Sequence, residues 1–159
     1  MTSEISAIIK ERRSFYPHEF IKGEIPKKDI DSILENANWA PNHGMTEPWR
    51  FFVFSGKGLQ SSHVIAIIMQ RGNNKKIPVL EEVEAVACAV QNMALTVTDL
   101  GYGAYWSTGG MVKFKEAKEF FGLREEDQLL GLFYIGKVVT TKKDSKRGAI
   151  TDKVTWVNE

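Results

Sequence analysis

The spacing of hydrophobic residues along the chain predicts three amphipathic helices. Ser3 is a suitable N-cap, and apolar residues at helical spacing follow it, so we expect a first helix from about Glu4 to Arg13. A second helix is expected between Pro26, which suits a first helical turn, and Pro41, which ends it. One continuous apolar stripe predicts a long third helix over Leu80–Leu100. The apolar positions behind these predictions are Ile5, Ile8 and Ile9, then Ile30, Ile33, Leu34 and Ala37, then Val83, Val86, Ala87, Val90, Met93, Ala94 and Val97.

Apolar runs between these helices predict a β-sheet. His63–Met69 is apolar on both faces and indicates a buried central strand. The expected strands are Trp49–Phe54, His63–Met69, Gly103–Trp106 and Leu129–Val138. A further short helix is expected over Phe114–Phe121, where Gly122 ends it. Helices packed on a sheet give an α+β layer structure, and 159 residues suit one domain that spans residues 1–159.

The connection Ser55–Ser62 between the first two strands is unusually short. Its length allows a hairpin, but Gln60, Ser61 and Ser62 lack the residues that favour tight hairpin turns. We therefore expect either that the protein is trimmed here or that a segment is missing between Gln60 and Ser61.

The composition indicates a globular protein and argues against nucleic acid or a membrane surface as its partner. Hydrophobic residues make up 43% and charged residues 26%, and the formal net charge is +1, so neither a nucleic-acid nor a membrane-surface role is indicated. We expect no signal peptide, because no basic head followed by an apolar stretch is seen near Met1, and the longest apolar run, Val64–Met69, is too short to cross a bilayer. The single cysteine, Cys88, lies in the apolar run Ala85–Val90 and is expected to be a small buried residue. We expect a soluble, cytoplasmic protein.

Standard catalytic motifs are absent from the sequence. It contains no nucleophile elbow, HExxH, CxxC, P-loop or GxGxxG motif, and His18, His43 and His63 do not have the spacing of metal ligands. We expect no bound metal and no catalytic side chain of the protein. A bound organic cofactor that carries the chemistry is the expectation that remains.

Three short constellations are candidates for holding such a cofactor. Arg12-Arg13-Ser14 can form a phosphate clamp, although cations at this place can also merely complement a helix C-terminus. The loop with Asn42 and His43 can present polar groups from a rigid helix end, or it can be a capped turn over the core. The run Tyr105–Gly110 can bring backbone amides close to a planar ring, or it can be an ordinary turn after a strand.

In this order along the chain, the constellations resemble the nitroreductase family. The resemblance rests on Arg-Arg-Ser after a short helix, Trp-Ala-Pro-Asn-His before Glu-Pro-Trp-Arg-Phe, Trp-Ser-Thr-Gly after a long helix, and Lys-Arg-Gly near the end. It covers nearly the whole chain and is closest to the compact, YdjA-like branch. It implies a nitroreductase-like three-layer fold: a mixed, mostly antiparallel sheet flanked by helices, in an entwined homodimer.

The resemblance also implies a cofactor and its site. FMN would lie at the subunit interface, with NAD(P)H as co-substrate. Its phosphate and ribityl chain would contact Arg12, Arg13 and Ser14, with Arg147 and Lys146 as added cations. Its isoalloxazine pocket would be lined by Asn42 and His43 of the second subunit, and its edge would lie against Trp106, Ser107, Thr108 and Gly109. The nicotinamide would stack on the exposed flavin face, near Thr96–Gly101.

The implied activity is oxidoreduction by a ping-pong scheme. NAD(P)H gives hydride to FMN and leaves, and then a nitroaromatic, a quinone or a similar small acceptor takes the electrons. Two alternatives stay open: a dehalogenase or dehydrogenase on the same flavin fold, and a flavin-binding dimer without turnover. The sequence departs from the family at Phe15-Tyr16-Pro17, where many members carry another arginine, and at Met45-Thr46-Glu47, where Asn-x-Gln is common.

Overall fold

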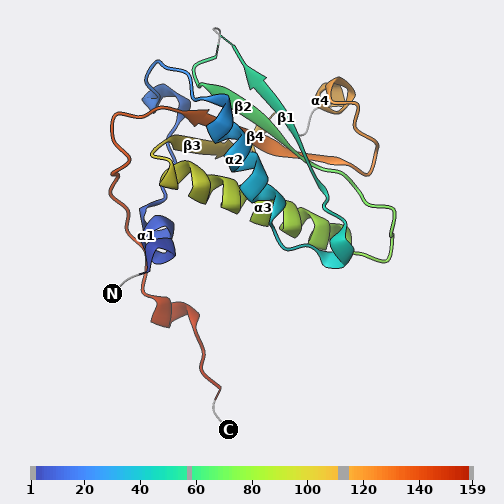
Figure 1. Ribbon diagram of the computed structural model, residues 1–159. Coiled ribbons are helices and arrows are strands. Elements are labelled where there is room, and N and C mark those ends of the chain that lie inside the picture. The colour runs from blue at the N-terminus through green and yellow to red at the C-terminus, as the bar shows by residue number, and fades with distance from the viewer. Residues whose placement is uncertain (1–2, 57–58, 111–114, 158–159) are drawn as a thin grey trace.

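The structure is a computed structural model that describes residues 3–56, 59–110 and 115–157 (Figure 1). The helices are α1 (Glu4–Glu11), α2 (Lys27–Asn38), α3 (Val79–Asp99) and α4 (Lys115–Phe120), the strands are β1 (Trp49–Ser55), β2 (His63–Met69), β3 (Gly103–Ser107) and β4 (Gln128–Gly136), and short 3-10 turns lie at Pro17–Glu19, His43–Met45 and Ile150–Lys153. No helix in these described ranges is long and apolar enough to span a membrane.

The strands form an antiparallel sheet in the order β1-β2-β4-β3. All seven residues of β2 are buried, which confirms the prediction of a central strand. Strand β1 pairs with β2 from Trp49 opposite Met69 to Ser55 opposite His63, so the two strands form a hairpin across the short connection. A segment missing between Gln60 and Ser61 stays a prediction.

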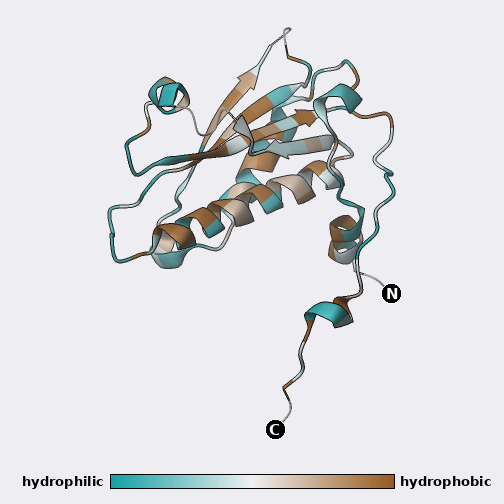
Figure 2. Cartoon of the chain, turned by 180° about the vertical axis from the view of Figure 1, so that it is seen from behind, coloured by the Kyte–Doolittle hydropathy of each residue, from teal (hydrophilic) through white to brown (hydrophobic). Residues whose placement is uncertain are grey.

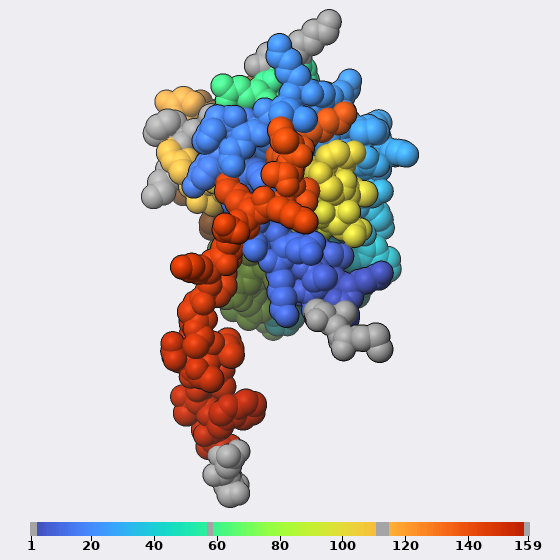
Figure 3. All heavy atoms as spheres, turned by 90° about the vertical axis from the view of Figure 1, so that its left-hand side faces the viewer, coloured from blue at the N-terminus to red at the C-terminus, as the bar shows by residue number. Residues whose placement is uncertain are grey.

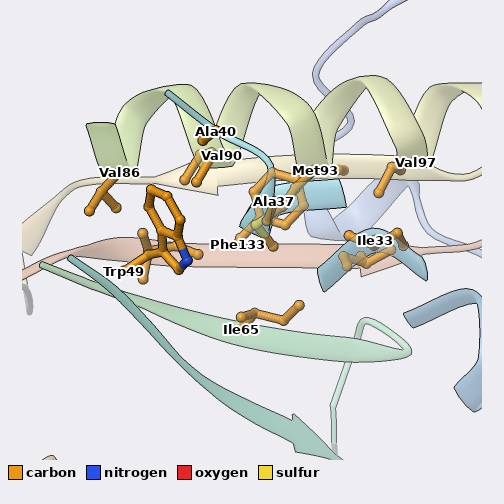
Figure 4. Close-up of a cluster of buried hydrophobic side chains, with 14 of the residues drawn as sticks. Ile33, Ala37, Ala40, Trp49, Ile65, Val86, Val90, Met93, Val97 and Phe133 are labelled. Carbon is orange, nitrogen blue, oxygen red and sulfur yellow. The ribbon is translucent and has the colours of Figure 1, made fainter. Parts of the chain in front are cut away.

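The main core lies between the sheet and the helices α2 and α3 (Figure 4). The apolar stripe of α3 faces the sheet, and α2 packs beside α3 on the same face. Residues from both helices and both central strands meet there: Ile33, Ala37, Ile65, Val86, Val90, Met93 and Phe133. Figure 2 shows that the strands and α3 are largely hydrophobic, as the sequence pattern predicts.

The opposite face of the sheet carries a smaller core under α4. Ala66, Ile68 and Leu129 are buried there, and Ala117 of α4 packs against them. The ring of Phe52 on β1 meets the ring of Phe121 edge to face, with 5.1 Å between ring centroids. Helices therefore cover both faces of the sheet, in agreement with the expected α+β three-layer arrangement.

Residues 138–157, which we call the C-terminal arm, first lie against the segment that follows α1, up to Lys143, and then extend away from this body (Figures 1 and 3). The arm ends in apolar residues, and the side chain of Trp156 is 84% exposed. An exposed tryptophan at the end of a polar arm is typical of a segment that contacts another molecule.

Two expectations need correction. The first helix ends at Glu11 rather than Arg13, and Arg12 is its C-cap, with an extended backbone at ψ 124°. Cys88 is exposed, not buried, because α3 turns Val86 and Val90 toward the sheet and leaves Cys88 on the opposite side. Phe114, the expected start of the short helix, lies outside the described residues.

Candidate functional site

The end of α1 places Arg12, Arg13 and Ser14 against the edge of the sheet. Phe15 is buried and its backbone N–H donates a hydrogen bond to the carbonyl oxygen of Ala104, while Ser14 forms a parallel bridge with Ala104. A Cβ atom at Gly103 would lie 3.1 Å from the Phe15 ring, so a glycine at this point of β3 lets the ring come close. The buried ring thus fixes the three preceding residues beside β3.

These three residues form one end of a pocket of about 230 Å³ between α3 and the sheet. The other walls are mostly small or apolar residues of α3, together with residues of β3 and β4. The lining residues are Arg12, Arg13, Ser14, Ala87, Val90, Gln91, Ala94, Val97, Thr98, Ala104, Trp106 and Phe133. The pocket is therefore cationic at one end and largely apolar along its length.

Arg12 carries an unbalanced positive charge at this pocket. The pKa of Arg12 lies below its ordinary value. Partial burial is the largest cause, and repulsion from Arg147 and then from Arg13 adds to it. Among the described residues, no carboxylate or hydrogen-bond acceptor contributes to that shift. Arg12 and Arg147 are 135 positions apart in sequence, yet they lie close enough to repel each other, so an anion placed between them would be strongly favoured.

Arg13 also lines the pocket, but its guanidinium is engaged with backbone oxygens. Its Nε donates to the carbonyl of Lys143 at 2.6 Å, and its Nη1 donates to the carbonyls of Lys10 and Arg12 at 2.6 and 2.9 Å. Arg13 thereby joins the end of α1 to the C-terminal arm. The sequence motif suggests two equivalent arginines, whereas the structure gives them different tasks.

Trp106 supplies an unpaired donor on the apolar wall. Its Nε1 atom is buried, and no hydrogen-bond partner for it lies within the described residues. A Cβ atom at Gly131, which has φ 142°, would lie 2.5 Å from this nitrogen and 2.5 Å from the carbonyl oxygen of Ser107. Gly131 is thus required for the packing of Trp106, and the sequence motif around Trp106 does not reveal it.

The other residues expected at the flavin edge and phosphate lie near the pocket but do not line it. Ser107 is the last residue of β3, and Thr108 and Gly109 follow it as exposed residues. Lys146 is exposed on the C-terminal arm, next to Arg147. Arg147 itself donates to Ser145 Oγ at 2.6 Å and to the carbonyl of Lys146 at 3.0 Å.

Asn42 and His43 lie apart from these residues, at the N-terminal end of α3. Asn42 shapes its own loop, because its Oδ1 accepts a hydrogen bond from the backbone N–H of Glu47 at 3.0 Å. His43 is exposed, and its Nδ1 lies 2.5 Å from Oε2 of Glu81. Glu81 is about 25 Å along the helix from Thr98, near the arginines, at 1.5 Å per residue. Within one chain, the structure does not bring Asn42 and His43 to the arginine end of the pocket.

No metal site is found in the part of the chain that the structure describes, since no three His, Cys, Asp or Glu side chains come together there. The pocket instead offers a cationic end and an apolar wall with one unpaired N–H donor. Such a site suits an elongated ligand with an anionic group at one end and a planar ring at the other.

Comparison with known proteins identifies the family. The sequence profile of the Nitroreductase family matches residues 9–62 and 56–137, so the chain belongs to that family. The two matched segments overlap at residues 56–62, which is the short connection between β1 and β2.

Relatives in two bacteria agree with this assignment. "Putative NAD(P)H nitroreductase YdjA" of Escherichia coli (strain K12) is 25% identical in an alignment 138 residues long, which covers 69% of this chain and 75% of YdjA. "Putative NAD(P)H nitroreductase YfhC" of Bacillus subtilis (strain 168) is 24% identical and covers 96% of this chain and 94% of its own length.

Solved structures share the fold. A nitroreductase-like family protein from Bacillus cereus has a TM-score of 0.86 at 24% identity and covers 100% of this chain and 98% of its own. A nitroreductase with bound FMN from Bacteroides fragilis NCTC 9343 has a TM-score of 0.75 at 18% identity and covers 99% of this chain and 100% of its own. The α+β fold expected from the resemblance is therefore confirmed.

Proposed function

We propose that this protein is an FMN-dependent oxidoreductase that passes electrons from NAD(P)H to small acceptors such as nitroaromatics or quinones. It would work as a cytoplasmic homodimer with FMN at the subunit interface, by the ping-pong scheme described above. The observation that carries the proposal is that Arg12 and Arg13 line one pocket whose remaining walls are mostly apolar, with Arg147 close enough to repel Arg12.

The residues of the pocket suit both ends of FMN. In the described part of the chain no acidic side chain offsets the charge of Arg12, and Ser14 lies at the same end, so a phosphate group there would be held by charge-assisted hydrogen bonds. The small side chains of Ala87 and Ala94 leave room for a planar ring along α3. Trp106 lines the same pocket, and its buried N–H lacks an acceptor among the described residues, which a ring heteroatom or carbonyl oxygen would supply.

Three observations support a second copy of the chain as part of the site. The pocket of about 230 Å³ is smaller than the roughly 300–1,000 Å³ of most ligand sites, so one chain alone encloses too little space. Asn42 and His43 lie too far from the arginine end to reach it within their own chain. The C-terminal arm extends from the body with Trp156 exposed, as expected of a segment that packs on a partner.

FMN, when bound, would supply the hydride and electron transfer itself. The side chains of this protein would bind its phosphate through Arg12 and Arg147, donate a hydrogen bond from Trp106, and exclude water along the apolar wall of α3. No general base of the protein is required by this scheme. These residues bind the flavin and do not by themselves select an acceptor, so the acceptor is tested separately below.

The first experiment is the visible spectrum of the purified protein after incubation with FMN. We expect a yellow protein with one FMN per chain. Arg12→Ala should weaken FMN binding by about 10- to 100-fold, because it removes a charge-assisted contact to the phosphate. Lys10→Ala, which removes an exposed positive charge from the last turn of α1, is the matched control and should change the affinity less than about threefold. A colourless protein that takes up no flavin would refute the proposal.

Turnover is tested with NADPH and NADH against two acceptor panels. Oxidation of either nicotinamide in the presence of a nitroaromatic or quinone, above the rate with free FMN, supports the proposed enzyme. Faster turnover of halogenated phenols would favour a dehalogenase on this fold. Flavin binding with no turnover of any acceptor would reduce the protein to a flavin-binding dimer.

The homodimer is tested by removal of the apolar end of the arm. Deletion of residues 154–159 leaves the described core and the arginines in place, and should lower the dimer affinity by at least about tenfold, since Val154, Trp156 and Val157 lose their partner surface. Light scattering over a concentration series measures the effect. A deletion variant that is as dimeric as the full chain would show that the arm does not hold the subunits together.

A further inference from the structure

Lys143 on the C-terminal arm is held by four groups of the segment that follows α1. Its ammonium group donates to both carboxylate oxygens of Glu19 at 2.8 and 2.9 Å and to the carbonyl of Ser14 at 3.1 Å. It also lies 5.1 Å from the ring centroid of Phe15 and 5.7 Å from that of Tyr16. The backbone of the same residue is held too, because Arg13 Nε donates to the Lys143 carbonyl at 2.6 Å.

Lys143 is the last point at which the described arm is hydrogen-bonded to the body. From residue 144 to 157, the hydrogen bonds of the described residues stay within the arm. Arg147 follows four residues later, so its Cα can lie at most about 14 Å from that of Lys143. The contacts at Lys143 therefore confine Arg147 to the neighbourhood of Arg12.

We propose that Glu19 and Lys143 form a latch that positions Arg147 for the phosphate group of the flavin, and that Glu19 thereby strengthens anion binding although it carries a negative charge. Glu19 and Lys143 would be positioning residues, since neither lines the pocket between α3 and the sheet. The inference rests on the proposed function, because it takes the phosphate of FMN as the anion.

The charge state of Glu19 suits this role. The pKa of Glu19 lies below its ordinary value. The hydrogen bond from Lys143 is the main cause, and the hydrogen bond from the Tyr16 backbone N–H is the second. The carboxylate is thus ionised at neutral pH. If the net charge of this region alone governed the site, loss of the negative charge of Glu19 would tighten the binding of an anion. The latch predicts the opposite: loss of the Glu19 charge should weaken the binding of the anion.

The experiment compares the affinities of FMN and riboflavin, which lacks the phosphate, in the full-length protein and in Glu19→Gln. The glutamine keeps the shape of the side chain and an oxygen that can accept the Tyr16 N–H, but it removes the charge that holds Lys143. We expect the dissociation constant for FMN to rise about tenfold, as for the loss of one charge-assisted hydrogen bond, and that for riboflavin to change less than twofold. Glu11→Gln, which removes an exposed acid from the end of α1, is the matched control and should leave FMN binding unchanged or slightly tighter.

A second pair of variants tests the latch from its other side. Lys143→Gln and Lys142→Gln each remove one positive charge from neighbouring positions of the arm, but only Lys143 contacts Glu19. We expect a loss of FMN affinity of tenfold or more for Lys143→Gln and of less than threefold for Lys142→Gln. This pair carries the test if Glu19→Gln does not fold.

The outcomes separate the latch from the proposed function. Wild-type protein that binds neither flavin overturns the proposed function itself. Wild-type protein that prefers FMN to riboflavin, together with a Glu19→Gln variant that binds FMN equally well or more tightly, overturns the latch alone. Equal losses for both flavins would also overturn it, because a general structural defect does not distinguish ligands by their phosphate.

Discussion

Two groups of charged residues in this protein are built on opposite principles. One is a buried network around Arg71 and Glu82 at the start of α3, and the other is the cluster of Arg12, Arg13 and Arg147 at the pocket. In the network every charge meets an opposite charge. In the cluster three positive charges converge, and no acid among the residues that the structure describes offsets Arg12.

The buried network is satisfied almost atom by atom. Arg71 and Glu82 are 5% and 1% exposed, and Arg71 Nη1 donates to Glu82 Oε2 at 2.6 Å. Arg71 Nη2 donates to the carbonyl of Ile77 at 2.6 Å, and the backbone N–H of Gly72 donates to Glu82 Oε1 at 3.1 Å. Asp127, also buried, accepts from the Arg71 N–H at 2.8 Å.

The difference shows that paired buried charges and unpaired charges at a pocket affect different properties of the protein. Burial of charge is costly, so a buried group persists only where partners compensate it, and such a network acts on the stability of the fold. A cluster of like charges at a pocket destabilises the empty site slightly and gains from an anion. We therefore expect substitutions in the network to change the free energy of unfolding and substitutions in the cluster to change ligand affinity.

The largest effect is expected from Arg71→Met. Glu82 would then be a buried carboxylate without its cation, and the free energy of unfolding should fall by about 3–5 kcal/mol. Urea denaturation of the flavin-free protein measures the loss. The double variant Arg71→Met/Glu82→Leu should recover most of it, because no unpaired charge remains. A loss below about 1 kcal/mol for the single variant would show that the network is not needed for stability.

A smaller effect, which depends on pH, is expected from Asp127→Asn. Burial alone would raise the pKa of Asp127, but hydrogen bonds from Arg124 and from the Arg71 backbone outweigh it and hold the pKa below the ordinary value of 3.8. The stabilisation is thus complete above pH 4 and is lost as the pH falls through the lowered pKa of the folded state.

Unfolding free energies of Asp127→Asn and wild type should therefore differ by about 1–3 kcal/mol at pH 6 and converge below pH 4. Acidic groups elsewhere titrate in both proteins and cancel from the difference. A difference that stays constant down to pH 3 would assign the loss to packing rather than to the charge of Asp127.

The smallest effect on stability is expected from Arg12→Met. Because it relieves repulsion from Arg147 and Arg13, the flavin-free protein should unfold within about 0.5 kcal/mol of wild type or be slightly more stable. The rise in melting temperature on addition of FMN should shrink, since ligand stabilisation follows the affinity. A flavin-free variant that is strongly destabilised would remove the contrast between the two regions.

Much of the fold could be predicted from local patterns. The helical spacing of Ile30 and Ile33 and the uniformly apolar run of β2 gave α2 and the central strand nearly to the residue, because burial on one or both faces leaves a period that the sequence shows directly. The exposure of Cys88 could have been found in the same way. At 100° per residue it points about 160° away from Val86 and Val90, which lie in the middle of the buried stripe of α3.

The site could be predicted only in part. The motif Arg12-Arg13-Ser14 marks a cationic helix end, but nothing in it distinguishes Arg12 from Arg13. Arg12 is repelled by two other arginines, with no offsetting acid among the described residues, whereas Arg13 is bound to backbone carbonyls. Lys143 and Glu19 are 124 positions apart, and their partners have no local signature. Gly131 is likewise unremarkable in the sequence, although the packing of Trp106 requires it.

The sequence by itself determined the family, the α+β class, most helix and strand positions and the presence of arginines at a helix end, since each of these follows from residue order over short distances. Only the tertiary structure decided which charges are paired and which are left over. The pairing of Arg71 with Glu82, the meeting of Arg12 with Arg147 and the hold of Glu19 on Lys143 arise where distant segments pack together. Coulomb forces act through space and not along the chain, so the balance of charge at the pocket becomes visible only in the folded molecule.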